Sequence, residues 1–263
     1  MKVRSLFICL LLPIFFHASS SARNILPLPA HHNELAIVID DLGNDMKGTE
    51  EILKLPVTLT IAVMPFLPTT RKDAEKAHGL GHEVIVHLPM EPMSGKASWL
   101  GPGAITTSLS NDEIRKRVEK AIEEVPYAVG VNHHMGSRAT ANERVMRIVL
   151  AVCKEKGLFY LDSKTTGKSV IPKLAKELDV PYLENELFFD DVYTIQHIGK
   201  QAKLLSKELD SDTSTIAIGH VGVTGIKVAT MLQEFLPLYE KKASIVPLSD
   251  LIPEYHLIDE SMP

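Results

Sequence analysis

Cysteine is nearly absent from this sequence, and so are long apolar segments and clusters of basic residues. Only two of the 263 residues are cysteines, and one of them, Cys9, lies in an apolar stretch close to the N-terminus. If that stretch is removed as a leader, Cys153 is left without a partner, and an intrachain disulfide is excluded. Cys153 falls on the apolar face of an expected helix, so we expect an inert core residue there.

The lack of basic clusters bears on the partner of the protein. The chain has 28 lysines and arginines against 33 aspartates and glutamates, and its net charge is −5. Proteins that bind nucleic acid carry basic patches that contact phosphates, so nucleic acid is not expected as the main partner. Hydrophobic residues make up 45% and charged residues 23% of the chain, a balance that predicts a globular rather than a disordered protein.

The apolar stretch near the N-terminus has the pattern of an export signal. Lys2 and Arg4 precede apolar residues 6–16, and small residues at 18–22 offer a cleavage site. The stretch is too short to span a bilayer comfortably, and no later stretch could form a transmembrane helix. We therefore expect an exported protein, periplasmic or extracellular, that keeps no membrane span once the leader is cleaved.

Composition divides the chain into four parts. We expect a signal peptide at 1–22, a linker at 23–34, one folded domain at 35–251 and a C-terminal tail at 252–263. Within the folded domain, short apolar runs alternate with helical patterns. The apolar runs predict strands at 35–39, 57–63, 83–86, 127–131, 158–161, 187–189, 215–218 and 245–248.

Seven or eight strand–helix units favour a parallel sheet that closes into a deformed (β/α) barrel. An open, doubly wound sheet is the alternative. Such sheets often carry a glycine-rich phosphate loop after the first strand, whereas residues 40–45 read Asp-Asp-Leu-Gly-Asn-Asp and are too acidic to hold a phosphate. We therefore expect the barrel.

Aspartate and histidine follow most of the expected strands. Because the C-terminal ends of parallel barrel strands share one rim, where active sites form, these side chains should meet there. As a set they have the ligand chemistry of a divalent metal such as zinc. The residues at the strand ends are Asp40, Asp41, His87, His133, His134, Asp162, Asp190, Asp191 and His220.

Strand geometry limits which of them can meet. His82 lies about 16 Å before His87 along one strand, so it cannot share an ion with His87, and we expect it on the surface. His133 and His134 are adjacent and should point to opposite faces, so only one of them is expected to be a ligand. Asp40 or Asp41 has a simpler alternative role, as the N-cap of a helix that begins near residue 47.

Several motifs together resemble the divergent polysaccharide deacetylase branch of the polysaccharide deacetylase superfamily, a branch found in bacterial cell envelopes. The resemblance covers about residues 35–250. It rests on Ile-Asp-Asp-Leu-Gly at 39–43 and on the segments 81–92, 130–137, 161–163, 188–190 and 218–220. It implies a deformed (β/α) barrel of the deacetylase type and a metal-dependent hydrolase that removes N- or O-acetyl groups from sugars of the cell envelope.

The resemblance also implies roles for individual residues. Asp41, His87 and His134 would bind the metal, Asp40 would be the general base, and His220 would be the general acid. The remaining site residues would support the metal ligands or contact substrate; they are His133, Asp162, Ser163, Asp190 and Trp99. The branch usually has asparagine where His133 stands, so His133 is either a neutral variant or an alternative ligand.

Other functions remain open at this stage. The barrel could bind an envelope glycan or a protein partner without catalysis, although binding alone needs neither a base nor an acid. It could also be a glycosidase that uses Asp40 and Asp190, which would leave the histidines without a role. Trp99 could form one wall of a sugar groove or plug the edge of the barrel. We favour the deacetylase.

Overall fold

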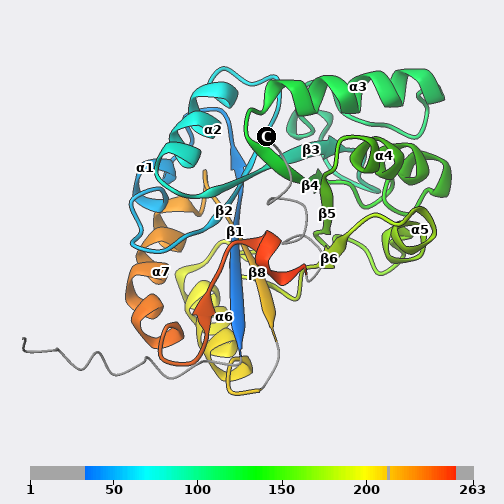
Figure 1. The fold of residues 1–263 in the computed structure, drawn as a ribbon. Coiled ribbons are helices and arrows are strands. Elements are labelled where there is room, and N and C mark those ends of the chain that lie inside the picture. The colour runs from blue at the N-terminus through cyan, green and yellow to red at the C-terminus, as the bar shows by residue number, and fades with distance from the viewer. Residues whose placement is uncertain (1–32, 212–213, 253–263) are drawn as a thin grey trace, which may run out of the picture. The chain divides into compact units, whose positions relative to one another are not determined.

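The structure is a computed structural model that describes residues 33–211 and 214–252 (Figure 1). The expected signal peptide, most of the expected linker and all but the first residue of the expected tail lie outside the described residues. Within the described ranges, no helix is both long enough and apolar enough to cross a membrane.

In the part of the chain that the structure describes, nine strands form one sheet in which every pair of neighbours runs parallel. Eight of them follow the order β6-β5-β4-β3-β2-β1-β8-β7, and β9 pairs with β1. The bounds are β1 Glu34–Leu42, β2 Thr60–Val63, β3 Glu83–Met90, β4 Ala128–Met135, β5 Phe159–Asp162, β6 Tyr182–Glu184, β7 Leu187–Phe188, β8 Thr215–His220 and β9 Ser244–Ile245.

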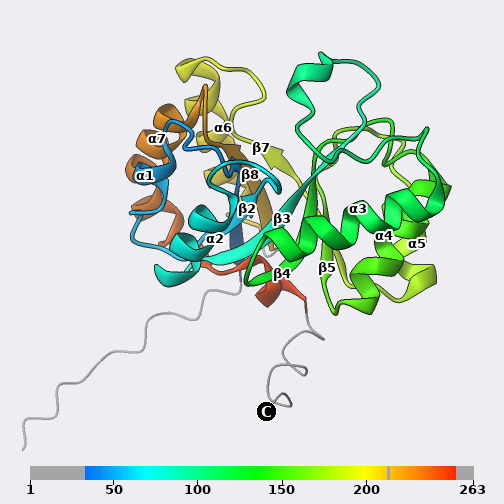
Figure 2. The same cartoon turned by 90° about the horizontal axis from the view of Figure 1, so that it is seen from above.

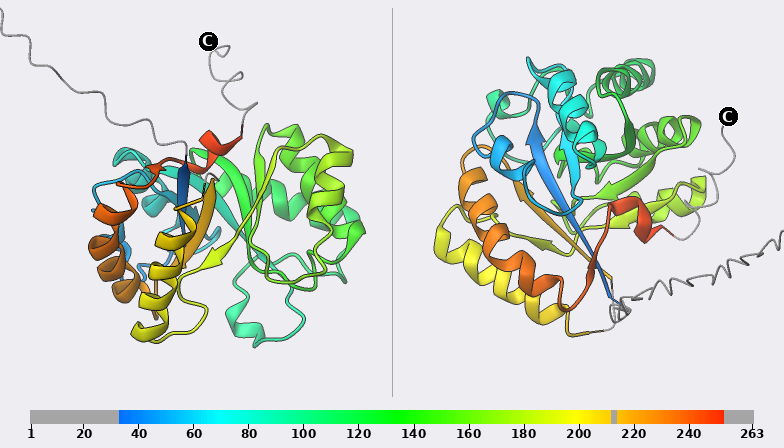
Figure 3. Two further views of the ribbon diagram at one scale, coloured as in Figure 1. Left: turned by 90° about the horizontal axis from the view of Figure 1, so that it is seen from below. Right: turned by 60° about the vertical axis from the view of Figure 1, so that its left-hand side comes forward.

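The two strands at the ends of this order, β6 and β7, follow each other in the chain, so the sheet curves round on itself (Figure 3). No ladder joins them among the described residues, so the barrel stays open there. The expected deformed (β/α) barrel is confirmed. Strand β6 is an addition to the expected set, and the expected strand at 245–248 is instead the short β9 followed by a 3₁₀ turn.

Helices connect the strands and cover the outer face of the sheet (Figures 2 and 3). Ser110 caps one of them, as its Oγ accepts a hydrogen bond of 3.2 Å from the Glu113 amide. The bounds are α1 Thr49–Ile52, α2 Thr70–Gly79, α3 Asn111–Glu124, α4 Glu143–Glu155, α5 Ile171–Leu178, α6 Ile195–Glu208 and α7 Gly225–Tyr239, with 3₁₀ turns η1 Ala97–Trp99 and η2 Leu248–Leu251.

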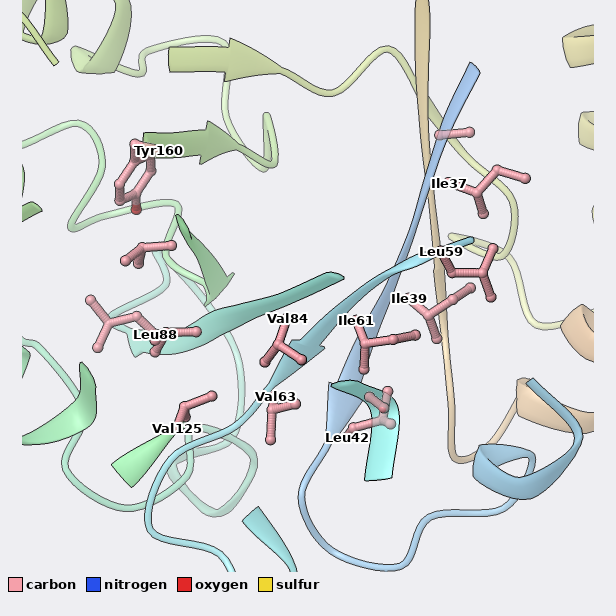
Figure 4. Close-up of a cluster of buried hydrophobic side chains, with 14 of the residues drawn as sticks. Ile37, Ile39, Leu42, Leu59, Ile61, Val63, Val84, Leu88, Val125 and Tyr160 are labelled. Carbon is pink, nitrogen blue, oxygen red and sulfur yellow. The ribbon is translucent and has the colours of Figure 1, made fainter. Parts of the chain in front are cut away.

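Two apolar cores lie on the two faces of the sheet because side chains alternate along each strand. On β1, Ile37 and Ile39 belong to the core shared with the helices, part of which Figure 4 shows. Ala36 and Val38 belong to a second core inside the barrel. Inward-facing side chains at the C-terminal ends of the strands therefore reach the interior of the barrel at that end.

The opposite end of the barrel is closed by the chain itself. Leu248 of η2 packs in the inner core. The half-buried Glu83 carboxylate accepts hydrogen bonds from the Thr60 hydroxyl and from the amides of Leu248 and Ser249. Burial raises the pKa of Glu83, and these hydrogen bonds act against that rise. The free space inside the barrel is thus left at the C-terminal ends of the strands.

Cys153 and His82 are both buried, as expected for the first and not for the second. Cys153 is fully buried on α4, and burial raises the pKa of its thiol to about 12, which fits an inert core residue. The surface position expected for His82 is wrong. Its ring is buried, where Nδ1 accepts a hydrogen bond from the Leu59 amide and Nε2 lies 3.1 Å from the Leu53 carbonyl oxygen.

Candidate metal centre and active site

A cavity of about 660 Å³ opens at the C-terminal ends of the strands. Its floor is polar and its walls are largely apolar. It is lined by Asp40, Asp41, Met46, His87, Trp99, His133, His134, Met135, Ser163, Thr165, Phe188, Asp190, Asp191, Tyr193, His220, Val221, Val223 and Thr224. All the site residues expected from the sequence except Asp162 are in this lining.

A β-bulge brings two adjacent carboxylates to the cavity. Ile39 belongs to the core shared with the helices, here called the outer core. Side chains alternate along a regular strand, so Asp40 points into the barrel and Asp41 would point outward. The pairing of β1 with β2 shifts register between Ile39 and Leu42, Asp41 has a positive φ of 73°, and Leu42 returns to the outer core. Such a bulge re-aims a side chain. Both carboxylates therefore line the cavity, and the helix-cap alternative is wrong, because Gly48 precedes α1.

Asp41, His87 and His134 form a compact group on the cavity floor. Their ligand atoms all lie within 4.8 Å of one another. Asp41 Oδ1 is 2.9 Å from His134 Nδ1 and 3.2 Å from His87 Nε2. Burial by itself would raise the pKa of the Asp41 carboxyl, but contacts with His134 and His87 hold it well below its usual range.

Two atoms of this group have no hydrogen-bond partner of acceptable geometry, although they are buried. They are Asp41 Oδ1 and His87 Nε2. Buried polar atoms are nearly always satisfied, so two orphans that face each other need an explanation, and a bound cation is one. One carboxylate oxygen and two imidazole nitrogens also make the donor set of a catalytic zinc site, which keeps a position open for water or substrate. The residues present therefore fit a divalent metal.

Asn132 links the metal group to the neighbouring carboxylate. It is the register partner of His87 on β4, its Oδ1 lies 2.7 Å from His87 Nδ1, and it is fully buried. Its Nδ2 donates a hydrogen bond of 2.8 Å to Asp40 Oδ1. If His87 Nδ1 carries the proton and donates it to Asn132, the lone pair of Nε2 is left facing Asp41, as a metal ligand requires.

The second histidine of the group is oriented by main chain. His134 Nε2 lies 2.9 Å from the carbonyl oxygen of Trp99, in the segment that joins β3 to α3. The Trp99 side chain is 59% exposed, so it does not plug the barrel edge. It lines the cavity, and its expected role as a wall of a sugar groove stays a prediction.

His220 faces the same cavity from β8, beside Asp40 in the ladder. Its Nδ1 lies 2.8 Å from Asp190 Oδ1, and the second oxygen of Asp190 accepts hydrogen bonds from the His220 amide and the Thr224 hydroxyl. Burial disfavours a charged ring, but the hydrogen bond and charge of Asp190 prevail and raise the pKa of His220 to about 10. His220 is therefore an imidazolium at neutral pH.

His133 lies on the other side of β4 from His134, as alternation requires. Its Nδ1 is 3.2 Å from the Tyr160 hydroxyl, and its Nε2 is 3.4 Å from the Thr165 hydroxyl. Burial, together with the nearby histidines, lowers its pKa to about 3. It is not part of the three-residue group, so the alternative that made it a ligand is not supported.

Asp162 is the last residue of β5 and Ser163 follows it, on the His133 side. Asp162 Oδ1 accepts a hydrogen bond from the Lys164 amide and is 3.9 Å from His133 Nε2, while Ser163 Oγ lies 3.5 Å from the His133 carbonyl oxygen. Their contacts among the described residues are with His133 and Lys164 rather than with Asp41, His87 or His134, so both support the strand end. Asp162 is fully buried.

Sequence reasoning missed Asn132. The signal was present, because strict alternation from residue 130 onward puts Asn132 on the same face as His134. An asparagine that follows Gly130 and Val131 and precedes two histidines does not by itself indicate a functional residue. Only the pairing of β3 with β4 places it opposite His87.

Comparison with protein families agrees with this architecture. Residues 37–252 match the family described as divergent polysaccharide deacetylase. A relative in Escherichia coli K12, the uncharacterized protein YibQ, is 34% identical over 235 residues, which are 89% of this chain and 72% of that protein.

Solved structures show the same fold. An uncharacterized protein from Agrobacterium tumefaciens C58, ATU2773, superposes with a TM-score of 0.74 at 19% identity, covering 86% of this chain and 91% of that one. The chitin deacetylase of the fungus Colletotrichum lindemuthianum superposes with a TM-score of 0.50 at 12% identity, covering 84% of this chain and 87% of that one. At these identities the likeness concerns the fold alone.

Proposed function

Because the chain belongs to the divergent polysaccharide deacetylase family, we propose that it is an exported, metal-dependent hydrolase that removes acetyl groups from a saccharide of the cell envelope. The observation that carries the proposal is the pair of orphaned atoms, Asp41 Oδ1 and His87 Nε2, at the floor of a cavity that also holds Asp40 and His220. Export rests on the pattern of residues 1–22.

Asp41, His87 and His134 would hold the ion, and zinc suits their donor set. A bound divalent metal supplies Lewis acidity toward a carbonyl oxygen and lowers the pKa of a bound water. Asn132 keeps the Nε2 lone pair of His87 directed at the group through its contact with Nδ1. The Trp99 carbonyl fixes the His134 ring in the same way.

Asp40 is suited to act as the general base. It is buried next to the metal group, and burial raises the pKa of its carboxyl, which makes it a better proton acceptor than an exposed aspartate. The hydrogen bond from Asn132 holds one oxygen in place. A carboxylate of this kind can take a proton from the attacking water.

His220 is suited to act as the general acid. Asp190 keeps the ring protonated and holds Nδ1, which leaves Nε2 to give a proton to the leaving nitrogen or oxygen of the sugar. Thr224 occupies the other oxygen of Asp190. This arrangement speaks against the glycosidase alternative, because Asp190 is buried and engaged on both oxygens.

Metal analysis combined with acetate release tests the proposal. Purified protein should bind about one divalent ion per chain and release acetate from acetylated chito-oligosaccharides. Asp41→Asn should lose both properties. Asp210→Asn is the matched control, because it makes the same change outside the cavity lining at an exposed carboxylate that pairs with Lys242.

Two results would contradict the proposal in different ways. A metal-replete preparation without bound ion would remove the metal centre. Stoichiometric metal without acetate release from any acetylated saccharide would favour the alternative of an inactive barrel that binds an envelope glycan or a protein partner.

A further inference from the structure

The charged side chains that line the cavity are mostly carboxylates. Its lining includes four aspartates, and no lysine or arginine among the described residues lines it. Three lysines close in sequence to lining residues have partners of their own. Lys164, between the lining residues Ser163 and Thr165, donates a hydrogen bond to Glu184. Lys96 places its ammonium 5.2 Å from the centre of the Trp99 ring, and Lys227 donates a hydrogen bond to the carbonyl oxygen of Tyr193.

Metal binding would not reverse this balance. A divalent ion and the protonated His220 together would offset the three carboxylates of the floor, Asp40, Asp41 and Asp190. Asp191 would remain as the charge nearest the mouth, where its side chain is 52% exposed and accepts a hydrogen bond from His197. A substituent of a bound sugar that points toward the mouth therefore meets negative charge without a fixed cation to pair with it.

Two exposed aromatic side chains also line this cavity. Trp99 is 59% exposed and Tyr193 is 61% exposed, values that are high for residues of this size. They come from different segments, η1 and the stretch that leads into α6, which Figure 2 shows at the same end of the barrel. Exposed aromatic rings beside a polar floor suit the apolar faces of sugar rings, whose hydroxyls stay in water.

Both aromatic residues are held by their main chain. The Trp99 carbonyl contacts His134 Nε2 at 2.9 Å, and the Tyr193 carbonyl accepts from Lys227 Nζ at 2.7 Å. The rings can thus be replaced without removing these contacts. The position of the Trp99 segment is tied to the metal group itself, so a sugar stacked on Trp99 lies close to the reactive floor.

We propose that the cavity selects uncharged acetylated oligosaccharides, which it holds with Trp99 and Tyr193, and rejects sugars that carry carboxylate or phosphate groups. This inference rests on the proposed function for its substrate class. It assigns Tyr193 as a residue of the binding site and Asp191 as the residue that disfavours anionic sugars.

Binding to metal-depleted protein tests the inference without needing the reaction. Calorimetry would compare penta-N-acetyl-chitopentaose with the same oligosaccharide oxidised to carboxylates at C6. The neutral ligand should bind at least tenfold more tightly. Trp99→Ala and Tyr193→Ala should each weaken its binding about tenfold, whereas Tyr193→Phe should keep it within about twofold.

Reversing the charge of Asp191 at the mouth of the cavity gives a second, independent binding test. Asp191→Lys should strengthen binding of the oxidised oligosaccharide about threefold to tenfold and leave binding of the neutral one within about twofold. Equal binding of the two ligands to the wild type, or no binding of either, would overturn the inference. Neutral binding without acetate release by the metal-loaded protein would instead refute the proposed function and leave this inference standing.

Discussion

Replacing Asn132 should distinguish its effect on metal binding through His87 from its effect on the proposed base, Asp40. Asn132→Ala removes the contacts with both His87 and Asp40. Asn132→Asp is of nearly equal size and still accepts a hydrogen bond from His87 Nδ1, but it replaces the amide donor to Asp40 with a second carboxyl group beside that residue. Comparing the two variants therefore tests which contact serves the metal and which serves the base.

The expected magnitudes follow from the hydrogen bonds. The atoms are 2.7 Å apart on the His87 side and 2.8 Å apart on the Asp40 side, and Asn132 is fully buried. Loss of a partner that orients a metal-bound histidine typically costs 10- to 100-fold in metal affinity. Loss of a hydrogen bond to a charged group costs about 1.5–3 kcal/mol, which is a factor of roughly 10 to 150 in rate if the base is displaced.

Competition with a chromophoric chelator measures the metal affinity, and acetate release at saturating metal measures kcat. Asn132→Ala should lose about 10- to 100-fold in zinc affinity, Asn132→Asp should keep its affinity, and both should lose kcat. Asn111→Ala, which changes an exposed asparagine bonded to Arg144, is the control. Thermal unfolding by circular dichroism checks that each variant folds. Unchanged zinc affinity and kcat in folded Asn132→Ala would refute the reasoning.

Three further predictions concern stability. Zinc at about 1,000 times its dissociation constant should stabilise the wild type by about 4 kcal/mol in thermal unfolding and leave Asp41→Asn unchanged; an equal shift in both would place the ion elsewhere. Asp190 outweighs burial and raises the pKa of His220 from 6.5 to about 10. In the metal-free protein, His220 therefore contributes stability that is fully present below pH 6.5 and is lost as the pH rises to about 10. Urea midpoints should follow this trend in the wild type and fall less in His220→Gln; equal slopes would argue against it. Glu83→Ala should cost about 1–3 kcal/mol in urea unfolding, because it leaves the buried Thr60 hydroxyl without its acceptor, whereas the exposed Glu124→Ala should cost under about 0.5 kcal/mol.

The order of strands and helices could be predicted from the sequence because it depends on local patterns. Apolar runs of β-branched residues mark buried strands, and Ser110 marks the start of α3. Strands linked by helices lie parallel, so the residues that follow them share one rim. That reasoning brought Asp41, His87 and His134 to one place without any knowledge of the contacts between them.

Other features could not be read from the chain. Neighbouring residues of a regular strand point to opposite faces, which correctly separated His133 from His134 but gave no reason for Asp40 and Asp41 to face the same cavity. The bulge that achieves this puts a non-glycine residue at a φ of 73°, a conformation that only the surrounding structure can impose. The burial of His82 likewise depends on Leu53, directly after α1, and on Leu59, directly before β2.

The sequence by itself determined which side chains reach the rim of the barrel, because periodicity and strand polarity are properties of each segment. Tertiary structure alone decided how those side chains pair. Asp40 and Asn132 are 92 positions apart, and His220 and Asp190 are 30 positions apart. Hydrogen bonds form only within about 3.5 Å, so each pair depends on how the sheet brings together segments that are far apart in the sequence. The same arrangement leaves Asp41 Oδ1 and His87 Nε2 facing each other without a hydrogen-bond partner.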